Sequence, residues 1–285
     1  MTGAVTKRGP AEIAPLRDVA RLSFNQVTSD RVSLPEMVEA CARHGIPYVS
    51  LWRHKIAETG LDASVRLLRD AGLRVSSVCR GGMFPAATRA EREQRIQDNL
   101  RAVDEAAALG APVLVLVCGA AADRDIAAAR QMVEDGIACI VPYATERQVT
   151  LGIEPLHPAF AAERSCITTL REARLLAEKL DRKTVGVVAD VYHIWWDPEV
   201  HAEIERCTGR LLGFHVSDWL APATNVLMNR GMMGDGVIEL RRLRESVERA
   251  GWSGPIEVEI FNETVWNTPI DELLPRLKER FLSCV

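Results

Sequence analysis

Eight short apolar runs alternate with stretches of helical character along this chain of 285 residues. Uninterrupted apolar runs of about four to eight residues are typical of strands that are buried on both faces, as in parallel sheets. Helix signals separate the runs, including predicted capping boxes at Ser33 and Thr88 and glycines at the helix ends, such as Gly45 and Gly72. Eight strand-then-helix units in a chain of this length predict an α/β fold, a closed (β/α)8 TIM barrel in a single domain.

The predicted barrel occupies residues 17–285, because no Pro/Gly/Ser-rich linker divides that range. Residues 1–16, which include Gly3, Gly9 and Pro10, are expected to form a flexible N-terminal lead-in. The expected strands are 22–25, 46–51, 73–78, 112–117, 150–154, 185–190, 211–215 and 256–259. The expected helices are 33–45, 62–71, 88–109, 123–147, 168–180, 198–207, 238–250 and 269–282.

Composition narrows the classes of function. The formal net charge of -4 gives no basic surface field, which disfavours nucleic acid as a partner. The seven cysteines lie apart without a Cys-x-x-Cys pair, so neither a disulfide framework nor a zinc ribbon is indicated, and a cytoplasmic location is expected. No segment has the apolar length of a membrane span, and the N-terminus lacks the order of a signal peptide.

The last four apolar runs each finish on a residue that can bind a metal: Glu154, Asp190, His215 and Glu259. Active sites of such barrels lie at the C-terminal ends of the strands, so barrel closure should bring these four side chains together. Unpaired charges at the rim of a core are costly, and one divalent cation would remove that cost for all four. Each residue alone has an ordinary alternative role, such as a helix cap or a core histidine, but four such coincidences on consecutive strands are a poor explanation.

Strand eight offers two glutamates, Glu257 and Glu259, which are two residues apart and therefore point to the same side of the sheet. Glu259 is nearer the open mouth and is the favoured ligand, while Glu257 is a partner one layer deeper or is paired to a buried base. The mainly oxygen ligand set suits Mn²⁺ or Mg²⁺ and also accepts Co²⁺ or Zn²⁺. A sugar or keto-sugar fits this site, with Glu154 and Glu259 as the catalytic pair that removes and returns a proton.

Residues in the loops after these strands are candidates for substrate binding: His157, Arg164, His193, Trp195 and Arg230. The polar ones could donate hydrogen bonds to sugar hydroxyl groups, and the indole ring offers a flat apolar face for stacking. Ordinary surface, capping or covering roles remain open for them, most of all for Arg164 and Trp195. The Gly81-Gly82 pair after strand three is too weak a signal for a phosphate site.

The motifs together resemble the sugar phosphate isomerase/epimerase family, also called the xylose isomerase-like barrels, which includes ketose 3-epimerases. The resemblance rests on Glu154-Pro-Leu, Asp190-x-x-His193, Phe-His215-Val-Ser-Asp, the Gly-Asp-Gly turn and Val-Glu259-Ile. It implies that Glu154, Asp190, His215 and Glu259 bind Mn²⁺, that the two glutamates are the acid/base pair, and that His193 contacts substrate. Relatives on this scaffold that cleave 3-oxo-glycosides, the C-glycoside deglycosidases, look similar in this half, so a lyase is the alternative.

Two further readings are weaker. A DNA-repair nuclease of the endonuclease IV class needs two or three metals held by more histidines than this rim supplies. A catalytically silent sugar-binding or partner-binding barrel is disfavoured by the intact acid/base pair. The resemblance leaves open a homo-oligomer or a second subunit that completes the site.

Overall fold

Eight parallel strands close into a barrel in the computed structural model, which describes residues 13–180 and 183–285. The strands follow one another around the barrel in chain order, and β10 pairs with β1 to close it. The predicted single-domain (β/α)8 barrel is therefore confirmed. The barrel strands are β1 (Leu22–Asn25), β2 (Tyr48–Trp52), β3 (Arg74–Gly82), β4 (Val113–Val117), β5 (Thr150–Ile153), β6 (Val185–Asp190), β7 (Leu211–Val216) and β10 (Ile256–Val258).

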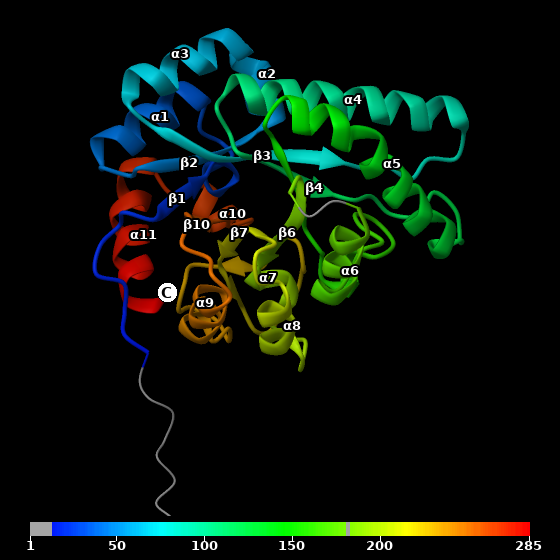
Figure 1. Cartoon of the computed structure of the whole chain (residues 1–285). Helices are drawn as coiled ribbons and strands as arrows, with labels where there is room; N and C mark the ends of the chain where they lie inside the picture. The colour runs from blue at the N-terminus through cyan, green and yellow to red at the C-terminus, as the bar shows by residue number, and fades with distance from the viewer. Residues whose placement is uncertain (1–12, 181–182) are drawn as a thin grey trace, which may run out of the picture.

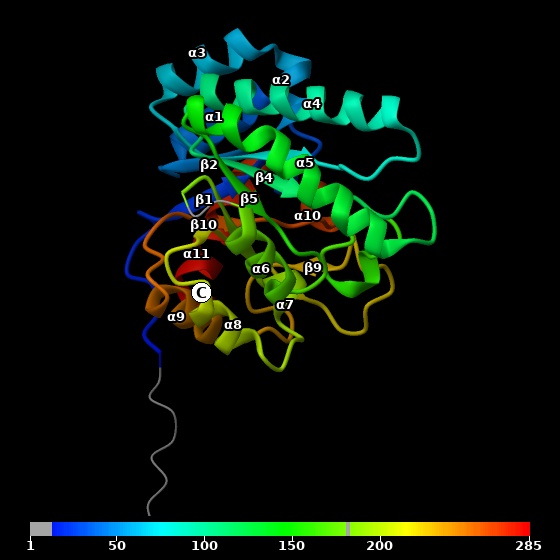
Figure 2. The same cartoon turned by 45° about the vertical axis from the view of Figure 1, so that its right-hand side comes forward.

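Helices cover the outside of the barrel, and α4 and α5 lie side by side beyond β3 and β4 (Figures 1 and 2). The main helices are α1 (Leu34–Arg43), α3 (Leu61–Ala71), α4 (Arg89–Ala108), α5 (Ile126–Glu146), α6 (Leu170–Leu180), α8 (Val200–Arg206), α9 (Leu240–Arg249) and α11 (Ile270–Cys284). These eight match the predicted helices. None of the described helices combines the length and apolar character that a membrane crossing requires.

Short elements that the sequence pattern did not predict sit mostly in the connections after the barrel strands. They are η1 (Gln26–Ser29), α2 (Arg53–Thr59), η2 (Pro158–Phe160), α7 (Val191–Ile194), β8 (Asp218–Trp219), β9 (Arg230–Gly231) and α10 (Glu263–Trp266). β8 and β9 form a separate two-stranded antiparallel sheet, a point that matters for the site. Residues 1–12 of the predicted lead-in lie outside the described residues, and residues 13–16 have no regular structure.

Helix capping follows the predicted signals in part. The Thr88 hydroxyl accepts from the backbone N–H of Glu91, and the Glu91 carboxylate accepts from the backbone N–H of Thr88, so α4 begins with a complete capping box. At α1 the Ser33 hydroxyl accepts from Glu36 N–H, which is one half of the predicted box. Gly72 closes α3 in the left-handed conformation that glycine adopts without steric cost.

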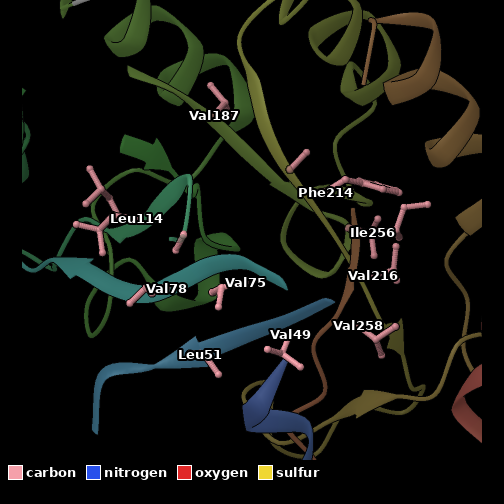
Figure 3. Packing of buried hydrophobic residues seen from close by; sticks show 14 of the residues in the cluster. Val49, Leu51, Val75, Val78, Leu114, Val187, Phe214, Val216, Ile256 and Val258 are labelled. Carbon is pink, nitrogen blue, oxygen red and sulfur yellow. The ribbon is translucent and has the colours of Figure 1, made fainter. Parts of the chain in front are cut away.

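Strand alternation divides the apolar residues into two layers. Side chains such as those of Leu114, Val187 and Ile256 lie in the large cluster between the strands and the helices (Figure 3). Their neighbours in sequence face the opposite side, and Val113, Val115 and Val188 therefore belong to a smaller cluster inside the barrel. This inner cluster lies beneath the polar residues at the C-terminal ends of the strands.

The end of β3 is held by a buried side chain of α4. Asn99 accepts a hydrogen bond from Gly82 N–H (2.6 Å) and donates one to the Gly82 carbonyl (2.8 Å), so it pairs both backbone groups at the last residue of the strand. Gly82 has a φ of +99°, and a Cβ there would lie 2.1 Å from the carbonyl oxygen of Val117. A side chain at position 82 would therefore collide with the backbone of β4.

We therefore expect Asn99→Ala to destabilise the protein by about 2–4 kcal/mol, because two buried backbone groups lose their partners. The free energy of unfolding from urea titration measures this change. The matched control is Gln97→Ala, which removes an exposed amide from the same helix and should cost less than about 0.5 kcal/mol. Equal stability of the two variants would contradict the role given to Asn99.

Candidate metal centre

Four buried side chains from consecutive barrel strands meet at the mouth of the barrel. Glu154 follows β5, Asp190 ends β6, His215 lies in β7 and Glu259 follows β10. One ligand atom from each lies within 4.8 Å of those of the other three. All four residues are at most 4% exposed. The predicted convergence of these residues is therefore confirmed, and they form a candidate site for a divalent cation.

The ring of His215 is oriented by carboxylates on both sides. Its Nδ1 faces Glu154 Oε1 at 3.3 Å and Glu259 Oε2 at 3.7 Å, while its Nε2 faces Glu257 Oε1 at 3.5 Å. Nδ1 is thus the atom available to an ion, and Nε2 is directed to a carboxylate behind it. Metal-binding histidines usually direct the second ring nitrogen to such a partner, which fixes the ring.

Glu257 is itself held in place one layer deeper in the barrel. Its carboxylate accepts hydrogen bonds from Asn25 Nδ2 at 2.7 Å and from the hydroxyl groups of Ser76 and Ser77 at 3.1 and 3.0 Å. Asn25 also donates to Glu259 Oε1 at 3.2 Å. A single side chain from β1 thus connects the carboxylate that orients His215 with a carboxylate of the cluster.

Two buried atoms of the cluster lack a hydrogen-bond partner among the described residues: Glu154 Oε1 and His215 Nδ1. These atoms face each other, and an unsatisfied buried polar group is costly. Ligand atoms about 2.1 Å from one ion lie at most about 4.2 Å from one another, so small side-chain shifts would bring the cluster to bonding distance. The donor set, three carboxylates and one imidazole, therefore fits a divalent cation.

Burial and neighbouring charges shift the pKa values of the two glutamates of the cluster in opposite directions. Burial, together with the nearby carboxylates Glu259 and Asp190, raises the pKa of Glu154 to about 7 against the lowering effect of His215. Burial also opposes ionisation of Glu259, but the Arg230 guanidinium and His215 lower the pKa of that carboxyl to about 2. The two carboxyl groups differ because only Glu259 lies against an arginine.

Arg230 enters this cluster from the β8–β9 sheet and not from an irregular loop. Its Nη1 donates to Asp190 Oδ2 at 2.7 Å and to Glu259 Oε2 at 3.1 Å, and its guanidinium lies 4.6 Å from the centre of the Tyr192 ring. The side chain is 4% exposed. The sequence analysis predicted that Arg230 binds substrate, which stays a prediction; in the structure its guanidinium is paired with two carboxylates of the cluster.

The other predicted substrate-binding residues fall into two groups. His193 and Arg164 line the pocket over the cluster, together with Glu154, Arg230 and Glu259. His193 Nδ1 lies 3.1 Å from the backbone nitrogen of His157, and its Nε2 lies 3.1 Å from Arg230 Nη2 and 3.6 Å from Asp190 Oδ2. Burial lowers the pKa of His193 to about 3, which keeps the ring neutral.

His157 and Trp195 are not among the described residues that line this pocket. The imidazole of His157 accepts from Ala159 N–H and so caps η2, and its ring packs against Trp196 and Trp219. Trp195 packs against Trp219. Both residues lie in an aromatic layer beside the pocket, and a direct substrate contact by either stays a prediction.

Several pocket residues were not predicted from the sequence. The apolar wall contains Trp52, Leu156, Phe160 and Phe261. Asn25 was also missed, although it ends the first strand as the ligands end theirs, and that shared position was a usable signal. It also accepts a hydrogen bond from the indole N–H of Trp52 at 2.8 Å, which fixes one wall of the pocket.

Comparison with known proteins agrees with this architecture. The chain belongs to the xylose isomerase-like TIM barrel family, whose model matches residues 38–280. It is 26% identical over 211 residues to L-ribulose-5-phosphate 3-epimerase UlaE of Escherichia coli K12, covering 71% of this chain and 70% of that protein.

Two solved structures are similar over nearly the whole chain. The crystal structure of protein SMc04130 from Sinorhizobium meliloti 1021 is 45% identical with a TM-score of 0.92, covering 94% of this chain and 99% of that one. The structure of the IOLI protein with a bound zinc atom has a TM-score of 0.83 at 17% identity, covering 93% and 98%. This last similarity shows the shared fold.

We expect Glu257→Gln to weaken binding of Mn²⁺ by about 10- to 100-fold, because the His215 ring loses the charged partner of its Nε2. Titration followed by electron paramagnetic resonance of free Mn²⁺ gives the dissociation constant. Glu263→Gln, at the exposed start of α10, is the control and should leave it unchanged. Unaltered affinity in a folded Glu257→Gln protein would show that this carboxylate does not support the centre.

Proposed function

We propose that the protein is a divalent-metal-dependent sugar isomerase or epimerase that transfers a proton at the carbon beside a carbonyl group. One observation carries the proposal: two buried glutamates, Glu154 and Glu259, flank the same histidine nitrogen within a cluster that fits a cation. A carboxylate near a substrate carbon is a competent general base or acid. Two of them at one site suit removal of a proton and its return.

The proposed cofactor is Mn²⁺, with Mg²⁺ or Co²⁺ as substitutes, because carboxylate oxygens make up most of the ligand set. The zinc atom in the IOLI structure supports a divalent metal in this fold. When bound, the cation would polarise the substrate carbonyl and stabilise negative charge that develops on its oxygen.

The side chains of the site would then carry out the proton transfer and position the reacting groups. One glutamate takes the proton from the substrate carbon and the other supplies a proton to the product, each through an oxygen that faces the pocket. Arg230 holds Asp190 and Glu259 in place through its two ion pairs. The neutral His193 lines the pocket and contacts the Arg230 guanidinium through Nε2, so it helps to position Arg230 beside the substrate.

The pocket wall suits a sugar. Trp52, Phe160 and Phe261 offer aromatic faces and edges against which the C–H groups of a sugar pack, while the cluster and His193 supply the polar contacts. The similarity to L-ribulose-5-phosphate 3-epimerase supports a keto-sugar as the substrate.

Entry of a sugar requires a movement. The pocket over the cluster has a free volume of about 20 Å³, which is room for about one water molecule and far less than the roughly 300 Å³ or more of a pocket that holds a small-molecule ligand. Leu227, from the connection between β8 and β9, lies against its wall. We infer that this connection shifts when substrate binds, because it carries the covering side chain and is not part of the barrel sheet.

The test is exchange of the substrate's carbon-bound hydrogen with solvent deuterium, followed by NMR in the presence of Mn²⁺ and a panel of ketoses and their phosphates. We expect Glu154→Gln and Glu259→Gln each to reduce exchange by about 10²- to 10⁴-fold, because one proton-transfer group is lost. Glu263→Gln should exchange at the wild-type rate.

Metal analysis of the same preparations separates the two roles of each glutamate. A variant that keeps its Mn²⁺ and loses exchange supports proton transfer, whereas a variant that loses both supports ligation. A wild-type protein that binds no divalent metal would refute the proposal. Release of an aglycone from a 3-oxo-glycoside, without epimerisation of free ketoses, would identify the protein as a lyase.

A further inference from the structure

Two arginines at the mouth of the barrel lack a carboxylate partner among residues 13–180 and 183–285. Arg80, in β3, lines a cavity of about 260 Å³ beside the metal centre, and Arg164 lines the pocket over the centre. Trp52 and Cys79 line both spaces, so the cavity and the pocket adjoin. The candidate metal ligands Glu154 and Glu259 line the pocket, and Arg80 lines the cavity on the other side of these shared walls.

Close backbone packing links the end of β3, which carries Arg80, to the connection after β5, which carries Arg164. The carbonyl of Arg164 accepts a hydrogen bond from Gly119 N–H at 3.1 Å. Gly119 in turn packs against Met83, since a Cβ at Gly119 would lie 2.9 Å from Met83 Cα. Arg80 Nη1 lies 3.0 Å from the sulfur of Met83. Met83 and Gly119 thus join the segment that carries Arg80 to the one that carries Arg164.

Two neighbouring arginines differ from Arg80 and Arg164 because they form ion pairs with carboxylates. Arg53, which also lines the cavity, binds Asp98 and Glu105, and Arg230 binds Asp190 and Glu259. Within the described part of the chain, neither Arg80 nor Arg164 lies within 4.0 Å of a carboxylate, and the thioether of Met83 is a weak partner for a guanidinium.

The positive charges also act on each other. Burial lowers the pKa of Arg164, and Arg80 and Arg230 lower it further by repulsion. Cationic groups that repel one another, with donors directed to a cavity, are stabilised by a ligand that brings negative charge. Arginine is well suited to this task because its planar fork donates two parallel hydrogen bonds to a phosphate or carboxylate.

We infer that the substrate carries an anionic oxygen group, a phosphate ester or a carboxylate, which Arg80 and Arg164 bind at the mouth of the barrel. This inference rests on the proposed function, because it assigns the other end of the same substrate to the metal centre. The three carboxylates of the centre disfavour an anion there, so the charged group is directed to the arginines. A substrate with an oxyanion remote from its carbonyl therefore binds in one orientation.

Binding of small anions to the Mn²⁺-loaded protein tests the site without reference to catalysis. Inorganic phosphate and malonate are titrated separately by calorimetry into the wild type, Arg80→Gln, Arg164→Gln and the control Arg66→Gln, which changes an exposed arginine on α3. We expect each variant of the pair to weaken anion binding about tenfold or more, because a charge-assisted hydrogen bond is lost, and the control to match the wild type. The bound Mn²⁺ should be unchanged in all four proteins.

The hydrogen-exchange assay tests the same inference with substrates. We expect a ketose phosphate or a keto-sugar acid to be processed with a higher kcat/KM than the matching neutral ketose, and the two arginine variants to remove that preference through KM. If phosphate binds more tightly than malonate and the ketose phosphate has a higher kcat/KM than the keto-sugar acid, the substrate is assigned as a sugar phosphate. The reverse result assigns a sugar acid.

The outcomes separate the two ideas. Anion affinity and charged-sugar preference that survive in both Arg80→Gln and Arg164→Gln overturn the inference, even if exchange of ketoses proceeds. Loss of anion binding in these variants, with no exchange on any sugar by the wild type, supports the anion site and refutes the proposed function.

Discussion

Three carboxylates buried within a few ångströms of one another are the constraint on which this structure depends. Their mutual repulsion and loss of hydration oppose folding unless positive charge and hydrogen-bond donors compensate. The chain provides compensation from separate elements: Arg230 from the β8–β9 sheet, His215 from β7 and Asn25 from β1. The pairing of β10 with β1 brings Asn25 to the other members of this set, so closure of the sheet completes the site.

The fold could be predicted because its signals are local. Apolar runs, capping residues and closing glycines specify each strand and helix within a few positions, and the order of the elements then selects the barrel. The four candidate ligands were also predictable, since strand ends in a parallel barrel lie on one rim. Their convergence follows from topology without knowledge of any side-chain contact.

The rest of the site depends on contacts between distant parts of the chain. No local pattern indicates that Asn25 reaches Glu257 across 232 positions, or that Arg230 and Gly231 pair with β8. Arg80 follows the expected strand 73–78 in a segment where an arginine is commonly a surface residue, so no pattern singled it out; the structure extends β3 to Gly82 and includes it. His157 was predicted to bind substrate because it lies near Glu154 in the sequence. In the structure its ring caps η2 and packs against Trp196, and a contact of this kind is not visible in the sequence.

The β8–β9 pairing divides one connection into a part that positions Arg230 and a part that covers the pocket. The paired residues anchor Arg230 over the centre, whereas the segment between them bears Val226 and Leu227 and contributes to the cover of the pocket. Insertions or deletions in that segment can reshape the cover without disturbing the anchored guanidinium. Evolution can therefore alter which molecules enter this barrel while the chemistry beneath is inherited intact.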